Sequence, residues 1–129
     1  MTRTVEPAAL AAGTSIVGTW NVVIVDWGCA GSPLRASPFT FNADGTWTYQ
    51  FGGGRWFQVE GMAVWTFTNA PGLVYTATVT RNSLAGIQGY ASAPPNPGTG
   101  CFYALRQASP AVAEELAAAP EADRDAAVG

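Results

Sequence analysis

Between residues 16 and 107 the chain is built from short stretches in which apolar and polar residues alternate or β-branched and aromatic residues gather. Each stretch is bounded by Gly, Pro, Asn or Asp, and none shows the three-to-four-residue period of an amphipathic helix. Period-two stretches separated by turn residues are typical of β-strands. We therefore predict eight strands, at 16–27, 37–42, 46–51, 55–59, 62–68, 73–80, 85–91 and 101–107.

The links between these stretches are short enough for hairpins, which favours a sheet in which each strand pairs with the next. Eight such strands close well into a barrel, because closure leaves no exposed edge. The two longest links, 28–37 and 92–100, then fall at the same end. The sequence therefore predicts an all-β protein, an eight-stranded antiparallel up-and-down β-barrel with a closed bottom and a loop-rimmed mouth.

The two ends of the chain are predicted to lie outside this barrel. We assign residues 1–15 to an N-terminal arm, 16–107 to one barrel domain and 108–129 to an acidic Ala/Glu-rich tail. Pro110 suits a first helical position and Pro120 would end a helix, so we expect the tail to be a short helix or disordered. With no clear signal peptide and no run of about 18 apolar residues, we expect a cytoplasmic protein that does not enter a membrane, and a secreted form stays open.

Charge and composition narrow the chemistry further. Residues 1–107 carry five Arg and four acidic residues without a basic cluster, which argues against nucleic-acid binding. The chain contains no His, which excludes the usual catalytic triads and most metal sites. We therefore predict neither a cofactor nor a metal. The expected partner is an apolar small molecule, and a homodimer stays open.

The two cysteines are expected to be neighbours. An up-and-down barrel places its last strand beside its first, which brings Cys29 and Cys101 together at the mouth. Whether they form a disulfide or remain two small buried side chains stays open.

The first and last predicted strands carry short motifs. "GTW" at 18–20 opens the first strand, and "GCFYALR" at 100–106 ends in Arg106. These motifs resemble the calycin pattern of lipocalin and avidin-like barrels, and "FTFNADGTW" at 39–47 resembles short bacterial lipocalin-like barrels. The resemblance implies that Trp20 plugs the closed end with Arg106 packed across its ring, a cation–π contact. At the level of fold, the chain is also similar to small β-barrel (4+2) cyclases of polyketide pathways.

Alternation assigns side chains to the interior. If Trp20 points inward, then Val22, Ile24 and Asp26 should follow it. A three-residue turn with Gly45 left-handed would pair Phe41 with Trp47. The inward residues of the hairpin and of strand 73–80 would then be Phe39, Phe41, Trp47, Tyr49, Leu73, Tyr75, Ala77 and Val79.

Two registers remain open. A three-residue turn with Gly61 left-handed, which we favour, points Arg55, Phe57, Trp65 and Phe67 inward. A two-residue turn at 60–61 instead pairs Trp56 with Trp65 and leaves Arg55 outside. In the last strand, the inward set is either Cys101, Tyr103 and Leu105 or Phe102, Ala104 and Arg106.

The predicted interior is strongly aromatic, with a few polar groups near the mouth. An aromatic cavity with a few orienting polar groups is typical of a site for an apolar ligand. The alternative is that eight short strands fill the barrel themselves and leave no cavity. As catalytic groups we predict Tyr49, Tyr75 and Arg55, and as ligand contacts Asp26, Phe39, Phe41, Trp47, Phe51, Phe57, Trp65, Phe67 and Tyr103.

With so few acid–base groups, chemistry that depends on shape is favoured. We expect a cyclase that folds a polyene or polyketide-like substrate for a (4+2)-type cyclisation, in which a Tyr hydroxyl or Arg55 polarises a carbonyl. One alternative is a non-catalytic, lipocalin-like carrier of a hydrophobic ligand. Another is an inhibitory module that acts through the Pro-rich loop at 93–98.

Overall fold

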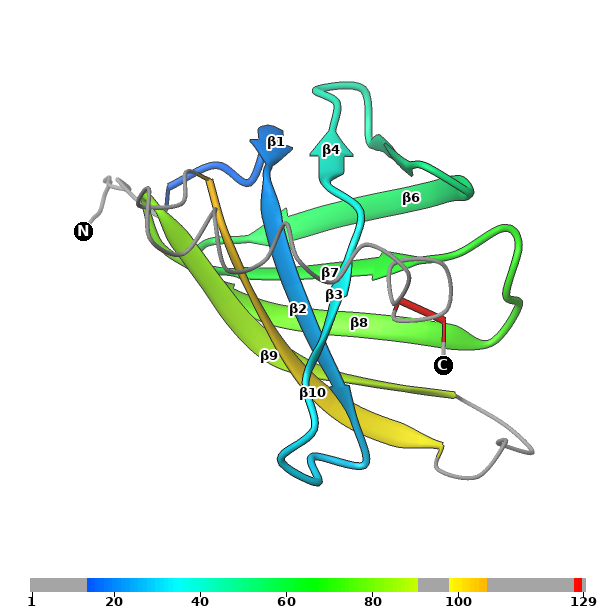
Figure 1. The fold of residues 1–129 in the computed structure, drawn as a ribbon. Coiled ribbons are helices and arrows are strands. Elements are labelled where there is room, and N and C mark those ends of the chain that lie inside the picture. Colours follow the sequence, from blue (N-terminus) through cyan, green and yellow to red (C-terminus); the bar gives the residue numbers. More distant parts are fainter. Residues whose placement is uncertain (1–13, 91–97, 107–126, 129) are drawn as a thin grey trace.

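The computed structural model describes residues 14–90, 98–106 and 127–128, and these residues form ten β-strands and no helix (Figure 1). The expected 93–98 loop and 108–129 tail lie almost wholly outside them. All strand pairs are antiparallel. The strands are β1 (Gly18–Trp20), β2 (Val22–Trp27), β3 (Leu34–Ala36), β4 (Phe39–Phe41), β5 (Thr46–Tyr49), β6 (Gly52–Val59), β7 (Met62–Thr66), β8 (Leu73–Val79), β9 (Ser83–Tyr90) and β10 (Thr99–Leu105).

The sheet curls round on itself. Its strand order is β1-β4-β5-β6-β7-β8-β9-β10-β2-β3, and β1 is separated from β2 by Asn21 alone. The run formed by β1 and β2 pairs with β4 and β3 on one side and with β10 on the other. The predicted all-β antiparallel fold class is therefore confirmed, with the sheet curled into a half-barrel. Ten strands replace the expected eight because the first predicted strand is interrupted at Asn21, and because β3 forms within the stretch that was predicted to be the link 28–37.

The closed end is fixed by Arg106. Its guanidinium carbon lies 4.0 Å from the centre of the Trp20 ring, which confirms the contact that the calycin resemblance implies. The same guanidinium donates hydrogen bonds to the carbonyl oxygens of Arg81 (2.8 Å), Val17 (3.1 Å) and Ser15 (2.6 Å). Burial lowers the pKa of Arg106 from its usual value. One side chain thus ties the last strand to the chain before β1 and to the turn before β9.

The interior face of the first run changes at Asn21, which corrects one expectation. Trp20 belongs to the core, but Val23 and Val25 follow it there instead of Val22 and Ile24. The paired run bends at the same level, since Trp20 lies opposite Phe39 and Val23 opposite Ala36. The alternation of inward and outward side chains is interrupted because the run of β1 and β2 and the run of β3 and β4 bend at the same level. Beyond the bend, the residues that simple alternation would point outward point inward.

The turns set the remaining registers. Gly45 has φ +90°, and Phe41 lies opposite Trp47 as predicted. In the turn between β6 and β7, Glu60 rather than Gly61 takes a positive φ, of 53°. The turn therefore contains two residues, and Trp56 lies opposite Trp65. The favoured three-residue register is wrong, and the alternative is confirmed.

The opposite end carries the disulfide. Cys29 and Cys101 are bonded, with Cα atoms 5.4 Å apart, so the predicted neighbours are joined. Such bonds are typical of oxidising compartments, and the cytoplasmic location expected above stays a prediction. Across the described residues, no helix has the length and apolar character needed to cross a membrane.

Candidate functional site

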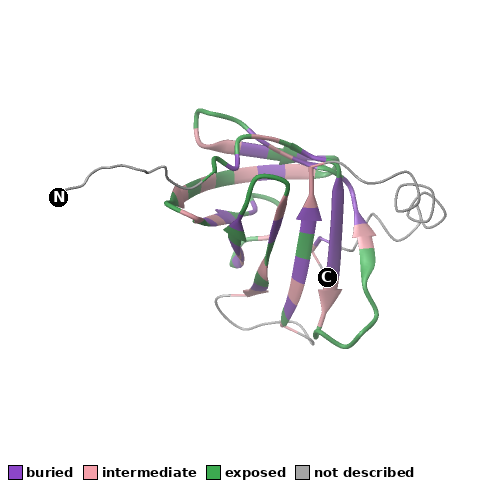
Figure 2. Cartoon of the chain, turned by 90° about the vertical axis from the view of Figure 1, so that its left-hand side faces the viewer, coloured by how far each residue is buried: buried purple, intermediate pink, exposed green. Residues whose placement is uncertain are grey.

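Most of the predicted aromatic residues gather in one buried cluster, and Figure 2 shows buried residues alternating with more exposed ones along the strands. Phe39 lies at the centre, 4.9 Å from Trp47 and 6.0 Å from Tyr75 between ring centroids. Trp47 lies 4.7 Å from Phe67, at a steep angle. These edge-to-face contacts make one continuous aromatic layer. Its members are Phe39, Phe41, Trp47, Tyr49, Trp65, Phe67, Tyr75 and Phe102, of which Phe102 came from one of the two open alternatives.

Five predicted site residues lie elsewhere. Phe57 is 57% exposed, and Arg55 is exposed too. The two-residue turn pairs Trp56 with the inward Trp65, so the side chains of Arg55 and Phe57 point to the outer face of β6. Tyr103 is 45% exposed, because Phe102 takes the inward position on β10. Phe51 is exposed in the turn between β5 and β6.

The fifth is Asp26, which serves the loop after β2. Its two carboxylate oxygens accept the backbone N–H groups of Ala30 (3.0 Å) and Gly31 (2.9 Å). The carboxylate therefore shapes the segment next to Cys29, and the expected ligand contact of Asp26 stays a prediction.

A row of directly paired residues crosses four strands near the disulfide end. Trp65 on β7 lies opposite Tyr75 on β8, Tyr75 opposite Gln88 on β9, and Gln88 opposite Gly100 on β10. Directly paired residues place their side chains on the same face of a sheet. Since Trp65 and Tyr75 belong to the core, Gln88 also faces the interior.

Gln88 is an unusual member of this row. It is 2% exposed, and neither its amide nitrogen nor its amide oxygen has a hydrogen-bond partner in the described structure. The same holds for the indole N–H of Trp65. Buried polar groups are nearly always paired, so each such group needs an explanation, for example a bound molecule.

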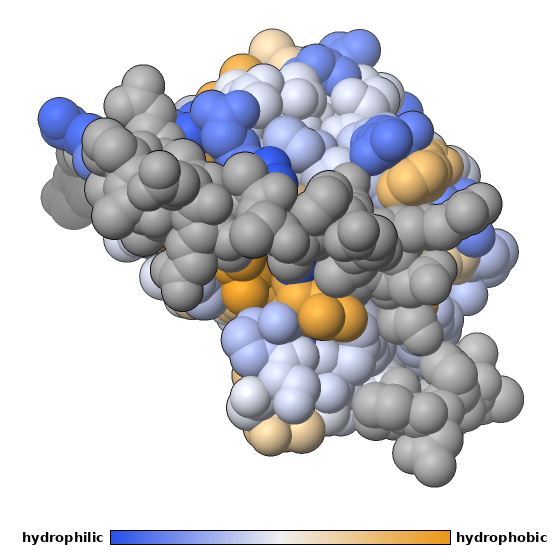
Figure 3. All heavy atoms as spheres, in the orientation of Figure 1, coloured by the Kyte–Doolittle hydropathy of each residue, from blue (hydrophilic) through white to orange (hydrophobic). Residues whose placement is uncertain are grey.

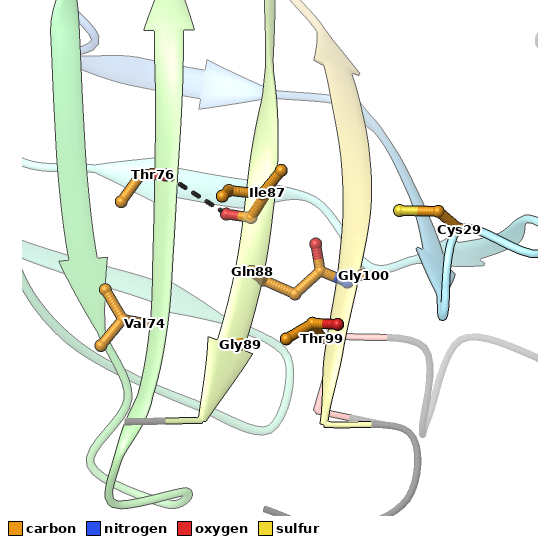
Figure 4. Close-up of a pocket in the computed structure, with 8 residues that line it drawn as sticks. All are labelled: Cys29, Val74, Thr76, Ile87, Gln88, Gly89, Thr99 and Gly100. Atoms are coloured by element: carbon orange, nitrogen blue, oxygen red, sulfur yellow. Dashed lines mark hydrogen bonds between the residues drawn. The ribbon is translucent and has the colours of Figure 1, made fainter. Parts of the chain in front are cut away.

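Glycine at position 100 makes room for that amide. Figure 4 shows the Gln88 side chain extending from β9 toward Gly100. A Cβ atom at position 100 would lie 2.6 Å from the Gln88 amide nitrogen and equally near the Asp26 carbonyl oxygen. The Gln88 amide therefore occupies space that a side chain at position 100 would need.

Two tyrosines next to Gln88 hold residues 127–128, which are drawn in red in Figure 1. The Tyr75 hydroxyl donates a short hydrogen bond to the Ala127 carbonyl oxygen, and the Tyr90 hydroxyl donates one of 2.8 Å to the Val128 carbonyl oxygen. Ala127 is fully buried and belongs to the core. Two successive peptide carbonyls thus accept hydrogen bonds from two phenols at this end of the barrel.

Both phenols stay protonated near neutral pH. Burial raises the pKa of Tyr75 well above its usual value, and the neighbouring Tyr49 and Tyr90 raise it further. Burial also raises the pKa of Tyr90, with a smaller contribution from Tyr49. A protonated phenol is a hydrogen-bond donor, so this end of the interior presents donors to any carbonyl that enters.

Tyr49 is positioned by the loop after β7. Its hydroxyl oxygen accepts a 2.8 Å hydrogen bond from the Asn69 side-chain amide, which also reaches the Phe51 carbonyl oxygen at 3.3 Å. Asn69 was not among the predicted site residues. Gln88 and Tyr90 were missed too, although their place beside Tyr75 follows from alternation once β8 and β9 are paired.

A hollow lies on the outer face of the same strands. Its volume is about 430 Å³, and the residues that line it are Cys29, Val74, Thr76, Ile87, Gln88, Gly89, Thr99 and Gly100 (Figure 4). Val74 and Thr76 alternate with the inward Leu73 and Tyr75, which places the groove outside the barrel. Figure 3 shows a hydrophobic area near the centre of the view and hydrophilic residues over much of the other coloured surface.

Within residues 14–90, 98–106 and 127–128, no cluster of three His, Cys, Asp or Glu side chains could hold a metal ion. The hydrogen-bonding groups around Gln88 are neutral: the phenols of Tyr75 and Tyr90, the amide itself and the Trp65 indole N–H. No protein-family model matches this chain, and no curated protein or solved structure matches it either.

Proposed function

We propose that the protein binds an apolar, carbonyl-bearing small molecule inside the barrel and promotes its cyclisation. The observation that carries this proposal is the set of neutral hydrogen-bonding groups on an aromatic wall, namely the Tyr75 and Tyr90 hydroxyls, the Gln88 amide and the Trp65 indole N–H. Apolar enclosures with a few placed polar groups are the usual form of small-molecule sites.

The aromatic layer supports an apolar, unsaturated ligand. Trp65 stacks on Tyr75 with ring centroids 5.4 Å apart, and Phe102 contacts both rings. Flat π faces of this kind contact a conjugated chain over a large area at little cost in side-chain entropy. A polyene is therefore the substrate that we favour.

The phenols support a chemical role. In a (4+2) cyclisation, the diene and dienophile lose two π bonds and gain two σ bonds, and no proton or electron enters or leaves. A hydrogen bond to a carbonyl conjugated with the dienophile lowers the barrier, and a folded substrate brings the reacting ends together. Tyr75 and Tyr90 are the donors that we assign to this task. Arg55, which is exposed, is no longer part of the proposal.

A carrier without chemistry is the second candidate. The absence of any charged group in the set made by Trp65, Tyr75, Gln88 and Tyr90 favours it, because simple retention needs only shape and hydrogen bonds. In that case the phenols and the amide orient the ligand and nothing more.

One incubation separates the two candidates. The protein is mixed with a linear polyene that ends in an α,β-unsaturated ketone, and tryptophan fluorescence and product mass are followed together. A cyclase gives an isomer of unchanged mass faster than buffer, and Tyr75→Phe slows its formation. A carrier gives a fluorescence change without an isomer. If neither signal appears, both functions are contradicted.

A further inference from the structure

The contacts of residues 127–128 bear on what the interior binds, and this inference rests on the proposed ligand-binding function. These residues place two peptide carbonyls against Tyr75 and Tyr90. We propose that residues 127–128 occupy the place of the ligand. The site then takes apolar molecules with two carbonyl oxygens spaced as in consecutive peptide units. Such a molecule displaces residues 127–128 when it binds.

The hydrogen bonds of Tyr75 and Tyr90 support the proposal that residues 127–128 and the ligand bind at the same site. Tyr75 is fully buried, and its hydroxyl reaches the Ala127 carbonyl, 52 positions away in sequence. Val128 packs against the core while its carbonyl accepts from Tyr90. A ketone oxygen accepts a hydrogen bond with the same geometry as a peptide carbonyl oxygen, although more weakly, so a donor that holds the first can also hold the second.

Residues 127–128 leave some hydrogen-bonding groups of the site without a partner. Gln88, which is paired with Tyr75 across the strands, keeps a donor and an acceptor without partners, and Trp65 keeps a donor. Leaving a buried polar group unpaired costs free energy. A ligand that also reaches Gln88 or Trp65 therefore makes hydrogen bonds that residues 127–128 do not make.

Small side chains fit a displaceable segment. Ala127 is buried with only a methyl group, so its departure removes little apolar contact from the core. A site that is occupied by its own chain for most of the time binds ligand more weakly, in proportion to the fraction of time it is free. Freeing the site should therefore tighten binding.

The test uses the neutral ketone probe prodan, whose fluorescence rises in apolar surroundings. Ala127→Glu places a carboxylate where the methyl group is buried, which should expel the segment. Ala85→Glu makes the same change on the exposed face of β9 and is the control. We expect prodan to bind Ala127→Glu about tenfold more tightly than wild type, as expected for a site about nine-tenths occupied, and Ala85→Glu to match wild type.

A short peptide completes the experiment. N-acetyl-Ala-Val-amide presents consecutive peptide carbonyls and should displace prodan from Ala127→Glu. Equal prodan affinity in wild type and Ala127→Glu would overturn the shared site and leave the ligand-binding function standing. If neither protein binds prodan, the proposed function fails together with this inference. Tight prodan binding that the peptide does not reduce would contradict the carbonyl spacing.

Discussion

The hydroxyl of Tyr75 donates a hydrogen bond to the backbone carbonyl of Ala127, and both residues are completely buried. Tyr75 thereby joins the aromatic layer to residues 127–128. Its strand neighbours, Trp65 and Gln88, carry buried polar atoms that lack partners among the described residues. The donors and acceptors of this row determine the expected effects of alkaline pH and of Gln88→Leu.

Stability should fall in alkaline solution because of Tyr75. Its pKa is raised well above 10.0 in the folded state, mainly by burial. The unfolded chain releases the phenol proton near pH 10, whereas the folded protein retains it, so the stabilisation is present below about pH 10 and is lost as the pH rises further. Urea unfolding at a series of pH values should show the decline, and Tyr75→Phe should reduce its slope. An equal slope in both proteins would contradict the assignment.

Gln88→Leu should keep or raise stability while weakening ligand binding. The amide is buried without partners, so an apolar side chain of similar size removes an uncompensated desolvation cost of about 1–3 kcal/mol. Gln50→Leu, at an exposed position in the turn after β5, is the control. Urea unfolding measures the stability of both variants, and prodan fluorescence measures their ligand binding. A large loss of stability in Gln88→Leu would mean that the amide has a structural partner.

Arg106→Gln should destabilise the closed end by about 2 kcal/mol, because it removes the cation–π contact with Trp20 and the charge that strengthens three hydrogen bonds to carbonyls. Arg55→Gln changes an exposed Arg to the same residue and should stay within about 0.5 kcal/mol of wild type. Thermal unfolding compares the two variants. Equal effects would show that the contact with Trp20 contributes nothing specific.

Loss of the disulfide should lower stability by about 4 kcal/mol, since the bond closes a loop between residues 72 positions apart. The double variant Cys29→Ser/Cys101→Ser and the reduced wild-type protein should unfold at the same urea concentration. A reduced protein as stable as the oxidised one would contradict this expectation.

Much of this fold could be predicted from local chemistry. Gly45 set the register of one hairpin, and the Trp20–Arg106 contact followed from two short motifs. The turn at 60–61 was misjudged because Glu60 adopts a conformation that favours glycine. At Asn21 the side chains that point inward change from one alternate set to the other, because the run of β1 and β2 bends together with the run of β3 and β4. The pattern of a single strand does not reveal such a bend.

The site was harder to predict for a related reason. Tyr75 and the aromatic layer followed from alternation, but Gln88 becomes notable only when the pairing of β8, β9 and β10 is known. Residues 127–128 carry no motif, and their contact with Tyr75 and Tyr90 depends on tertiary structure alone.

The infrared stretching frequency of a carbonyl bound in the barrel tests the central claim most directly. Prodan labelled with ¹³C at its ketone is bound to wild type, Tyr75→Phe and Tyr90→Phe. We predict a lower frequency in wild type than in hydrocarbon solvent, because a phenol donates to the bound ketone, and a return toward the hydrocarbon value when the donating hydroxyl is removed. A hydrocarbon-like frequency in wild type, unchanged in both variants, would contradict the account.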